Sequence, residues 1–133
     1  MASDPVASPA PPVGIILLSG AHDRAHYAFV LAAGAAALGR DVVMFASNRG
    51  CIALQSDIAA LDDAGREAVI EARGVAGLLT LRSACIEMGV RLIACDAGLR
   101  AEALDDAALL PQVEVAGVAT FFSAIGHGQI ITI

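Results

Sequence analysis

Residues 14–47, GIILLSGAHDRAHYAFVLAAGAAALGRDVVMFAS, decide the fold class of this chain. The short apolar run at 14–19 is typical of a strand that is buried on both faces. A helix of about four turns follows, with Asp23 as its expected N-terminal cap and Gly39 as its expected end. A second apolar run at 41–47 predicts another buried strand.

The same alternation of strands and helices continues to the end of the sequence. We expect strands at 90–95, 113–117 and 129–133, helices at 75–89, 101–110 and 118–126, and one or two short helices within 51–74. The strands are continuous apolar runs, which is typical of parallel strands covered on both faces. The sequence therefore predicts a three-layer α/β/α sandwich with a mostly parallel five-stranded sheet, the last strand lying at an edge.

Proline content separates the start of the chain from the rest. Residues 1–13 hold four of the five prolines, and we expect them to form a disordered tail. Residues 14–133 are expected to form a single α/β domain, because a chain of 133 residues fits one core.

The charged residues exclude several classes of function. The chain has a net charge of −6, and its eight basic residues are all arginines spread along the sequence, so we expect no binding to nucleic acid or to an anionic membrane. The absence of lysine excludes a P-loop lysine and a Schiff-base lysine. The N-terminus lacks the features of a signal peptide, and the longest uncharged segment, 27–39, is too short to span a bilayer. We therefore expect a cytoplasmic protein.

Chemistry in an open α/β sheet gathers outside the carboxyl ends of the strands. Four segments are predicted to lie on that rim: 19–24, 47–51, 95–98 and 116–120. They carry the candidate site residues His22, Asp23, Asn48, Arg49, Gly50, Cys51, Cys95, Asp96 and Gly117.

Cys95 is the candidate catalytic residue. A thiol at the end of a strand, beside the start of a helix, receives backbone N–H groups that favour the thiolate, which is the reactive form. Asp96 would oppose this if its carboxylate pointed inward. The alternative is that Cys95 is a small buried apolar residue that ends a strand.

The other two cysteines have weaker signals. Cys51 follows a glycine in a predicted loop, so it is either a resolving partner for Cys95 or an unpaired thiol at the start of a helix. Cys85 lies with Leu78, Leu81 and Met88 on one apolar stripe at helical spacing, which places it in the core.

The histidines do not make a metal site on their own. His22 and His26 are four residues apart with Asp23 nearby, but the sequence offers no third ligand at a defined spacing, so no metal is expected. His22 could instead orient or deprotonate a thiol. Arg49 could bind an anionic sulfur species or only a neighbouring carboxylate.

Three segments in order resemble one family. SGAHDRAHYAFVLAAGAAALGRDVVMF (19–45), EMGVRLIAC (87–95) and VEVAGVATFFSAI (113–125) are similar to segments of the DsrE/DsrF-like proteins, the superfamily of the TusD-type sulfur-relay subunits, and in particular to its peroxiredoxin-like DsrE branch. The resemblance covers nearly all of residues 14–125, and the functional cysteine of the family matches Cys95.

The resemblance implies a function as well as a fold. It implies a sulfur carrier or sulfurtransferase, or another thiol-redox protein, that holds sulfane sulfur as a persulfide on Cys95 without a cofactor. It also implies a homo-oligomer, with sulfur donor and acceptor proteins as partners. The rival hypothesis is a non-catalytic oligomeric module that binds a small ligand or a partner in the same fold.

Overall fold

The computed structural model describes residues 10–133. Five parallel strands form one sheet in the order β4-β3-β2-β1-β5. The strands are β1 (Val13–Leu17), β2 (Val42–Ala46), β3 (Arg91–Cys95), β4 (Glu114–Ala116) and β5 (Gln129–Thr132). All four strand pairs are parallel, so the sheet is entirely rather than mostly parallel, and β5 lies at an edge as predicted.

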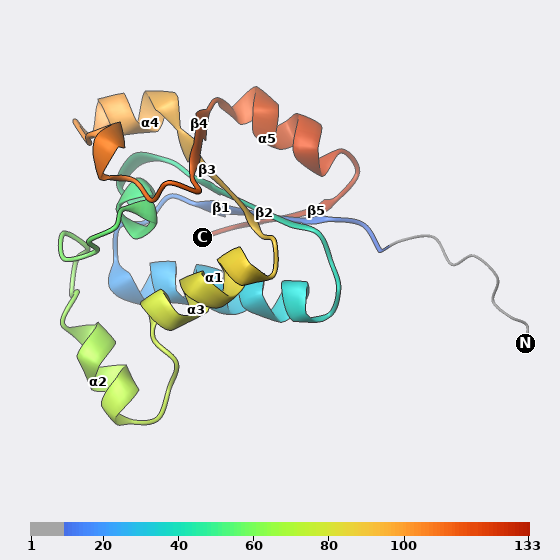
Figure 1. Cartoon of the computed structure of the whole chain (residues 1–133). Coiled ribbons are helices and arrows are strands. Elements are labelled where there is room, and N and C mark those ends of the chain that lie inside the picture. The colour runs from blue at the N-terminus through green and yellow to red at the C-terminus, as the bar shows by residue number, and fades with distance from the viewer. Residues whose placement is uncertain (1–9) are drawn as a thin grey trace, which may run out of the picture.

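Helices cover both faces of this sheet. The α-helices are α1 (His22–Ala37), α2 (Arg66–Ala72), α3 (Leu78–Glu87), α4 (Asp96–Ala101) and α5 (Val118–Ile125). Two 3-10 helices, η1 (Asn48–Leu54) and η2 (Asp106–Ala108), follow β2 and α4. Figure 1 shows α1 and α3 on one face, α4 and α5 on the other, and α2 away from the sheet. The predicted three-layer α/β/α sandwich is confirmed.

The two faces bury cores of different size. The larger core lies between the sheet and the helices α1 and α3, around Ile15, Leu17, Phe29, Met44 and Leu92. The smaller core lies under α5 and is formed by the buried residues Val43, Phe45, Ile93, Phe121 and Ile125. Successive residues of a strand point to opposite faces, so Ile93 and Cys95 share the face that α5 covers.

Several predicted boundaries need correction. Asp23 does not cap α1, because the N-cap is Ala21 and Asp23 lies in the first turn. The predicted helix at 101–110 is wrong: α4 begins directly after β3 and ends at Ala101, and only η2 follows. In the helical stripe at 75–89, Leu78 and Cys85 are buried, whereas Met88 is exposed.

The predicted tail lies partly outside the described residues. Nothing is described for residues 1–9, and β1 begins at Val13. The carbonyl of Pro11 accepts a hydrogen bond from Arg40 Nε at 2.8 Å, and that of Pro12 accepts one from the backbone N–H of Gln129 at 3.0 Å. Residues 11 and 12 are therefore bonded to the sheet and to the segment after α1.

Candidate functional site

Cys95 ends β3 and is also the N-cap residue of α4. Its sulfur accepts a hydrogen bond from the backbone N–H of Gly98 at 3.4 Å, and its side chain is half-buried beside the core under α5. The Cys95 sulfur thus has one backbone N–H donor. A backbone donor of this kind is more favourable to an anionic sulfur than to a neutral thiol.

Cys51 and Cys85 are fully buried, unlike Cys95. The Cys51 thiol donates to the carbonyl of Ala46 at 3.4 Å, and the Cys85 thiol lies 4.0 Å from the carbonyl oxygen of Phe29. Burial raises the pKa of each of these two thiols to about 11. Cys95 is therefore the one cysteine of the three that is not fully buried.

Asp96 does not turn its charge toward the Cys95 sulfur. Its carboxylate accepts a hydrogen bond from Arg100 Nη1 at 2.9 Å across one turn of α4, and both side chains are exposed. The ion pair holds the Asp96 carboxylate on the solvent side of the helix. The expected opposition between Asp96 and a Cys95 thiolate is thus weakened by solvent and by Arg100.

The loop after β2 touches the start of α4. A Cβ atom at Gly98 would lie 2.5 Å from the backbone nitrogen of Asn48 and would overlap the hydroxyl of Ser47. Gly98 is therefore required for α4 to lie on this loop, and the structure brings Asn48 close to the helix that Cys95 begins. Asn48 itself has a positive φ of 53°, a conformation that asparagine tolerates better than most residues.

Gly50 ties the same loop to β1. A Cβ atom there would overlap the carbonyl oxygen of Leu17, and the N–H of Gly50 donates to the carbonyl of Leu18 at 3.2 Å. This close approach fixes the position at which the next residue, Cys51, enters the core. The role of Gly50 is to position the loop by close packing.

Arg49 points to a different part of the rim. Its Nη2 donates to the carbonyl of Ala60 at 3.2 Å and to Asp62 Oδ1 at 3.3 Å. Arg49 and Asp62 are both exposed, so their interaction is weak, but it directs the guanidinium toward residues 60–62. Of the two hypotheses for Arg49, the structure supports the second, in which its guanidinium contacts a neighbouring carboxylate.

Gly117 follows Ala116, which is the register partner of Cys95 on β4. It is exposed, is the N-cap residue of α5 and has an extended backbone conformation. The carboxyl ends of β3 and β4 thus lie side by side. Four of the predicted site residues lie on backbone segments close to Cys95: Asn48, Cys51, Asp96 and Gly117.

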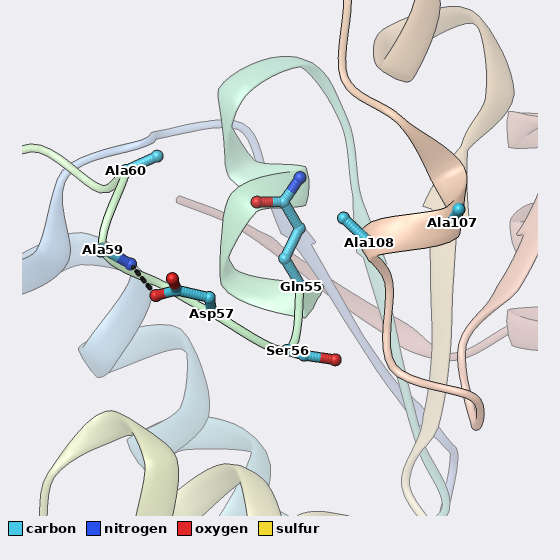
Figure 2. A pocket seen from close by; sticks show the side chains of 7 residues that line it. All are labelled: Gln55, Ser56, Asp57, Ala59, Ala60, Ala107 and Ala108. Atoms are coloured by element: carbon cyan, nitrogen blue, oxygen red, sulfur yellow. Dashed lines mark hydrogen bonds between the residues drawn. The ribbon is translucent and has the colours of Figure 1, made fainter.

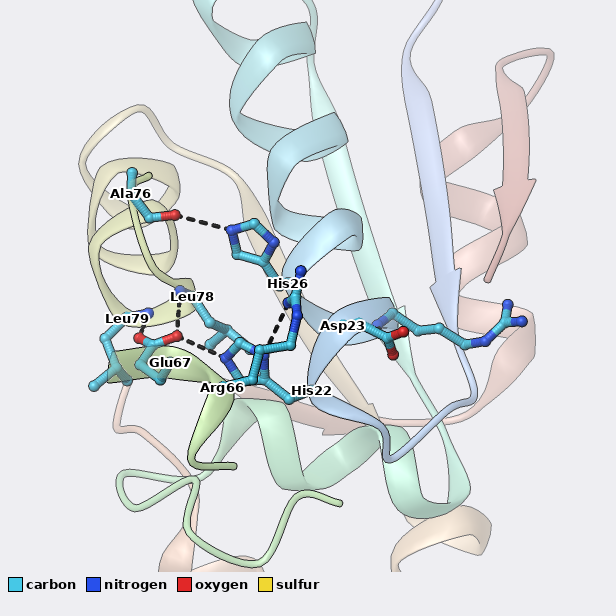
Figure 3. A network of polar contacts seen from close by, with 9 residues as sticks. His22, Asp23, His26, Arg66, Glu67, Ala76, Leu78 and Leu79 are labelled. Carbon is cyan, nitrogen blue, oxygen red and sulfur yellow. Dashed lines mark hydrogen bonds and ion pairs between the residues drawn. The ribbon is translucent and has the colours of Figure 1, made fainter. Parts of the chain in front are cut away.

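His22 lies in a separate polar cluster, which Figure 3 shows between α1, α2 and α3. Its Nε2 lies 2.7 Å from Glu67 Oε1 and its Nδ1 lies 3.2 Å from Arg66 Nη1. Arginine can only donate, so Nδ1 accepts and Nε2–H donates to the carboxylate. Both ring nitrogens are occupied, which leaves neither free to take a proton from a thiol.

Two further polar residues of α1, Asp23 and His26, also lack a contact with Cys95. His26 stacks on His22 with ring centroids 5.9 Å apart, and its Nε2 donates to the carbonyl of Ala76 at 2.9 Å. Asp23 is exposed and accepts the backbone N–H of Arg24 at 2.8 Å. In Figure 3 the Asp23 side chain points away from the histidine cluster.

Glu67 is the central residue of this cluster, and no motif or spacing in the sequence points to it. Its carboxylate accepts the backbone N–H groups of Leu78 at 2.8 Å and Leu79 at 3.0 Å, at the start of α3, in addition to His22. Burial acts to raise the pKa of Glu67, but the N–H donors of Leu79, His22 and Leu78 outweigh it and lower this pKa. Glu67 therefore caps α3 from α2.

Arg82 is a buried cation that sequence reasoning also missed. From α3, its Nη1 donates to the carbonyl of Ala53 at 2.8 Å and to that of Gln55 at 2.7 Å. Burial lowers the pKa of Arg82, and the negative charge of Glu67 acts in the opposite direction. Arg82 thereby holds the end of η1, the 3-10 helix that carries Cys51.

A hollow of about 500 Å³ opens beside η1, away from the predicted site residues. Figure 2 shows it between the segment after η1 and the 3-10 helix η2. It is lined by Gln55, Ser56, Asp57, Ala59, Ala60, Ala107 and Ala108. None of the predicted site residues lines it, so the thiol chemistry proposed from the sequence does not depend on this hollow.

Two further properties concern residues 10–133. Within that range, no group of three or more histidine, cysteine, aspartate or glutamate residues is placed to hold a metal ion. Within the same range, no helix has the length and apolar character needed to cross a membrane.

Comparisons with known proteins address the fold and the family. A solved structure described as a protein of unknown function, MTH1491 from Methanobacterium thermoautotrophicum, is similar with a TM-score of 0.56 and 21% identity. The similarity covers 92% of this chain and 99% of that one, and at this identity it bears on the fold alone. A comparison with curated proteins gives no match.

The family assignment rests on a sequence profile. The profile of the DsrE/DsrF/DrsH-like family matches residues 56–132, which is more than half of the chain. The matched region includes Cys95 and the strands β3, β4 and β5. The resemblance noted in the sequence is thereby confirmed, and the chain belongs to the DsrE/DsrF/DrsH-like family.

Proposed function

We propose that the protein is a sulfur carrier that accepts sulfane sulfur on Cys95, holds it as a persulfide and passes it to an acceptor. Membership of the DsrE/DsrF/DrsH-like family supports this at the level of the fold. The observation that carries the proposal is the contrast among the three cysteines. Cys95 is half-exposed and its sulfur has a backbone donor, whereas Cys51 and Cys85 are sealed in the core.

The proposed transfer needs only the Cys95 sulfur and a persulfide donor. The Cys95 thiolate attacks the terminal sulfur of the donor persulfide, and a new S–S bond forms while the S–S bond of the donor breaks. The donor leaves as a thiolate, so the number of electrons and sulfur atoms is conserved. Transfer to an acceptor thiol repeats the same exchange with Cys95 as the leaving group, and neither step requires a metal or cofactor.

The N–H group of Gly98 supports both steps. It is already directed at the Cys95 sulfur, at 3.4 Å, so the anionic sulfur meets a donor without any rearrangement of the backbone. The same donor stabilises Cys95 as the leaving thiolate in the second step. A thiol in this role must remain reduced between cycles, which is why we expect a cytoplasmic location.

The outer face of α5 supports the proposal that this chain works with partners. Helix α5 contains no charged residue, and Phe122 and Val118 on it are 54% and 47% exposed. Val115 on the neighbouring strand β4 is also exposed. An apolar helix of this kind is usually covered on both sides, so the same observation favours the second candidate function, a non-catalytic oligomeric module that binds a partner. We expect a homo-oligomer in either case, and sulfur donor and acceptor proteins as further partners of the carrier.

The two functions differ in the behaviour of one sulfur atom. The test uses a variant with Cys51→Ala and Cys85→Ala, in which Cys95 is the sole thiol, and a matched variant with Cys95→Ser. Each is treated with glutathione persulfide and weighed intact. The carrier predicts a gain of about 32 Da only when Cys95 is present, and loss of that gain when an acceptor thiol is added. No gain at Cys95 would leave the binding module as the better account.

A further inference from the structure

Ser47 is the neighbour of Cys95 at the end of the sheet. Ala46 on β2 is the register partner of Ala94 on β3, so the next residues along the two strands are Ser47 and Cys95. Both have an extended backbone, with φ and ψ of −137° and 161° at Ser47 and of −69° and 120° at Cys95. Adjacent strands are about 4.8 Å apart, so these two residues lie side by side across the sheet.

The side chains of Ser47 and Cys95 point to the same face of the sheet. Side chains alternate along an extended chain, so Ser47 shares the face of Phe45, and Cys95 shares that of Ile93. Phe45, Ile93 and Cys95 all pack in the smaller core under α5. The Ser47 hydroxyl is therefore on the side of the sheet where the Cys95 sulfur lies.

Gly98 contacts both side chains. Its backbone N–H donates to the Cys95 sulfur at 3.4 Å, and a Cβ atom at Gly98 would overlap the Ser47 hydroxyl. The sulfur and the hydroxyl thus both lie against one glycine at the start of α4. On the other side of Cys95, its register partner on β4 is Ala116, which has only a methyl group. Ser47 is therefore the polar one of the two residues that flank Cys95 in the sheet.

The backbone of Ser47 is held on both sides. Its N–H donates to the carbonyl of Leu17 at 3.0 Å, and its carbonyl accepts the N–H of Gly50 at 3.0 Å. The residue as a whole is half-buried. Its position beside Cys95 is fixed, whereas its hydroxyl hydrogen can rotate about the Cβ–Oγ bond toward an acceptor.

We propose that the Ser47 hydroxyl donates a hydrogen bond to the terminal sulfur of a Cys95 persulfide, an inference that rests on the proposed function. The terminal sulfur carries the negative charge of the persulfide anion and lies about 2 Å beyond the Cys95 sulfur. Directed along the sheet, it enters the space between the two neighbouring strands, where the hydroxyl lies. The inner sulfur keeps the N–H of Gly98, so each of the two sulfurs has its own donor. No covalent bond changes, and Ser47 keeps its proton.

This second donor determines how strongly the site holds sulfane sulfur. A hydrogen bond to a charged group is about twice as strong as one between neutral groups, and its loss shifts an equilibrium by about tenfold or more. The bond exists only in the loaded form, because the free thiol has no terminal sulfur. Ser47 should therefore change the affinity of the site for sulfur and leave the reactivity of the free Cys95 thiol nearly unchanged.

The test compares the wild type with Ser47→Ala, with Ser47→Thr, which keeps the hydroxyl, and with the matched control Ser83→Ala at an exposed position of α3. Each protein is equilibrated without oxygen in mixtures of glutathione persulfide and glutathione, and the fraction of Cys95 that carries an extra sulfur is read by peptide mass. We expect the exchange constant to fall about tenfold in Ser47→Ala and to stay within about twofold of the wild type in the other two variants. Equal constants in the wild type and Ser47→Ala, or equal losses in Ser47→Ala and Ser47→Thr, would overturn the inference.

The pH profile of the loaded protein is a second readout, which a change in packing would not move in the same way. The loaded proteins are alkylated with iodoacetamide between pH 4 and 8, and capture of the terminal sulfur is followed over time. Loss of the donor disfavours the anion, so the midpoint of this profile should lie about one pH unit higher in Ser47→Ala. An unshifted midpoint would overturn the inference, as would a change of the same size in the alkylation rate of the unloaded Cys95 thiol.

The two proposals fail in different ways. If no protein, the wild type included, gains sulfur on Cys95, the carrier function is rejected and the role of Ser47 with it. If the wild type and Ser47→Ala both load to the same extent, the carrier function stands and only the role of Ser47 is rejected.

Discussion

Replacement of Glu67 by alanine is expected to loosen the attachment of α2 and the start of α3. The carboxylate of Glu67 accepts the N–H groups of Leu78 and Leu79 and the Nε2–H of His22, at distances of 2.7 to 3.0 Å. Alanine accepts none of these bonds. Loss of an N-terminal cap costs about 1 kcal/mol, and an unpaired buried donor such as His22 Nε2 costs about 1 to 3 kcal/mol.

Together these losses reduce the free energy of unfolding by about 3 kcal/mol. The entropy of unfolding of a domain of this length is about 280 cal/mol/K, so the midpoint temperature should fall by about 10 °C. Thermal unfolding of the purified protein measures this change directly. Glu71→Ala on the same helix is the matched control, because Glu71 is exposed, and it should change the midpoint by less than about 2 °C.

The same contacts predict a dependence on pH. The pKa of Glu67 in the folded protein lies below its ordinary value of 4.5, so the stability from its ionised form is fully present above pH 4.5. It is lost as the pH falls through the folded pKa. The difference in stability between the wild type and Glu67→Ala should therefore shrink in acid. A Glu67→Ala midpoint equal to that of Glu71→Ala at pH 7 would refute the assignment of Glu67 as the cap of α3.

Three further substitutions test the packing of individual residues. Gly98→Ala should lower the free energy of unfolding by about 1 to 3 kcal/mol in a denaturant titration, because its Cβ would overlap Ser47 and Asn48. An unchanged midpoint would contradict this close approach. Gly34→Ala, in the last turn of α1 where an added Cβ meets no other atom, should raise the free energy of unfolding by about 0.5 to 1 kcal/mol. A loss of stability would contradict the open space at this position. Arg82→Met should lower the free energy of unfolding by about 2 to 4 kcal/mol, because it leaves the carbonyls of Ala53 and Gln55 without their donor. The control Arg73→Met, at an exposed residue, should change it little, and equal effects of the two would contradict the buried role of Arg82.

The sheet was predictable because its strands are buried on both faces. Apolar runs bounded by glycine or polar residues mark β1, β2 and β3 to within two residues, and parallel strands require helices between them. The position of Cys95 at the end of β3 followed from the same pattern. The candidate residue Cys95 could be placed on the rim for this reason alone.

The short helices were less predictable, since their ends depend on contacts between distant residues. Helix α4 has six residues and begins at Asp96 because Cys95 caps it and Gly98 leaves room for the loop at Ser47. No apolar periodicity marks so short a helix. The contact of Glu67 with Leu78 joins α2 to α3, and that of Arg82 with Gln55 joins α3 to the end of η1. Nothing in the local sequence indicates either pairing.

The rates at which the three cysteines are alkylated in the native protein test the central claim most directly. The wild type is treated with iodoacetamide at pH 8, and modified peptides are quantified over time, with a denatured sample as the reference. We expect Cys95 to react at least a hundredfold faster than Cys51 and Cys85, because those two are buried and their thiols have a pKa of about 11. Equal rates for the three cysteines, or a Cys95 that reacts only after unfolding, would contradict the account.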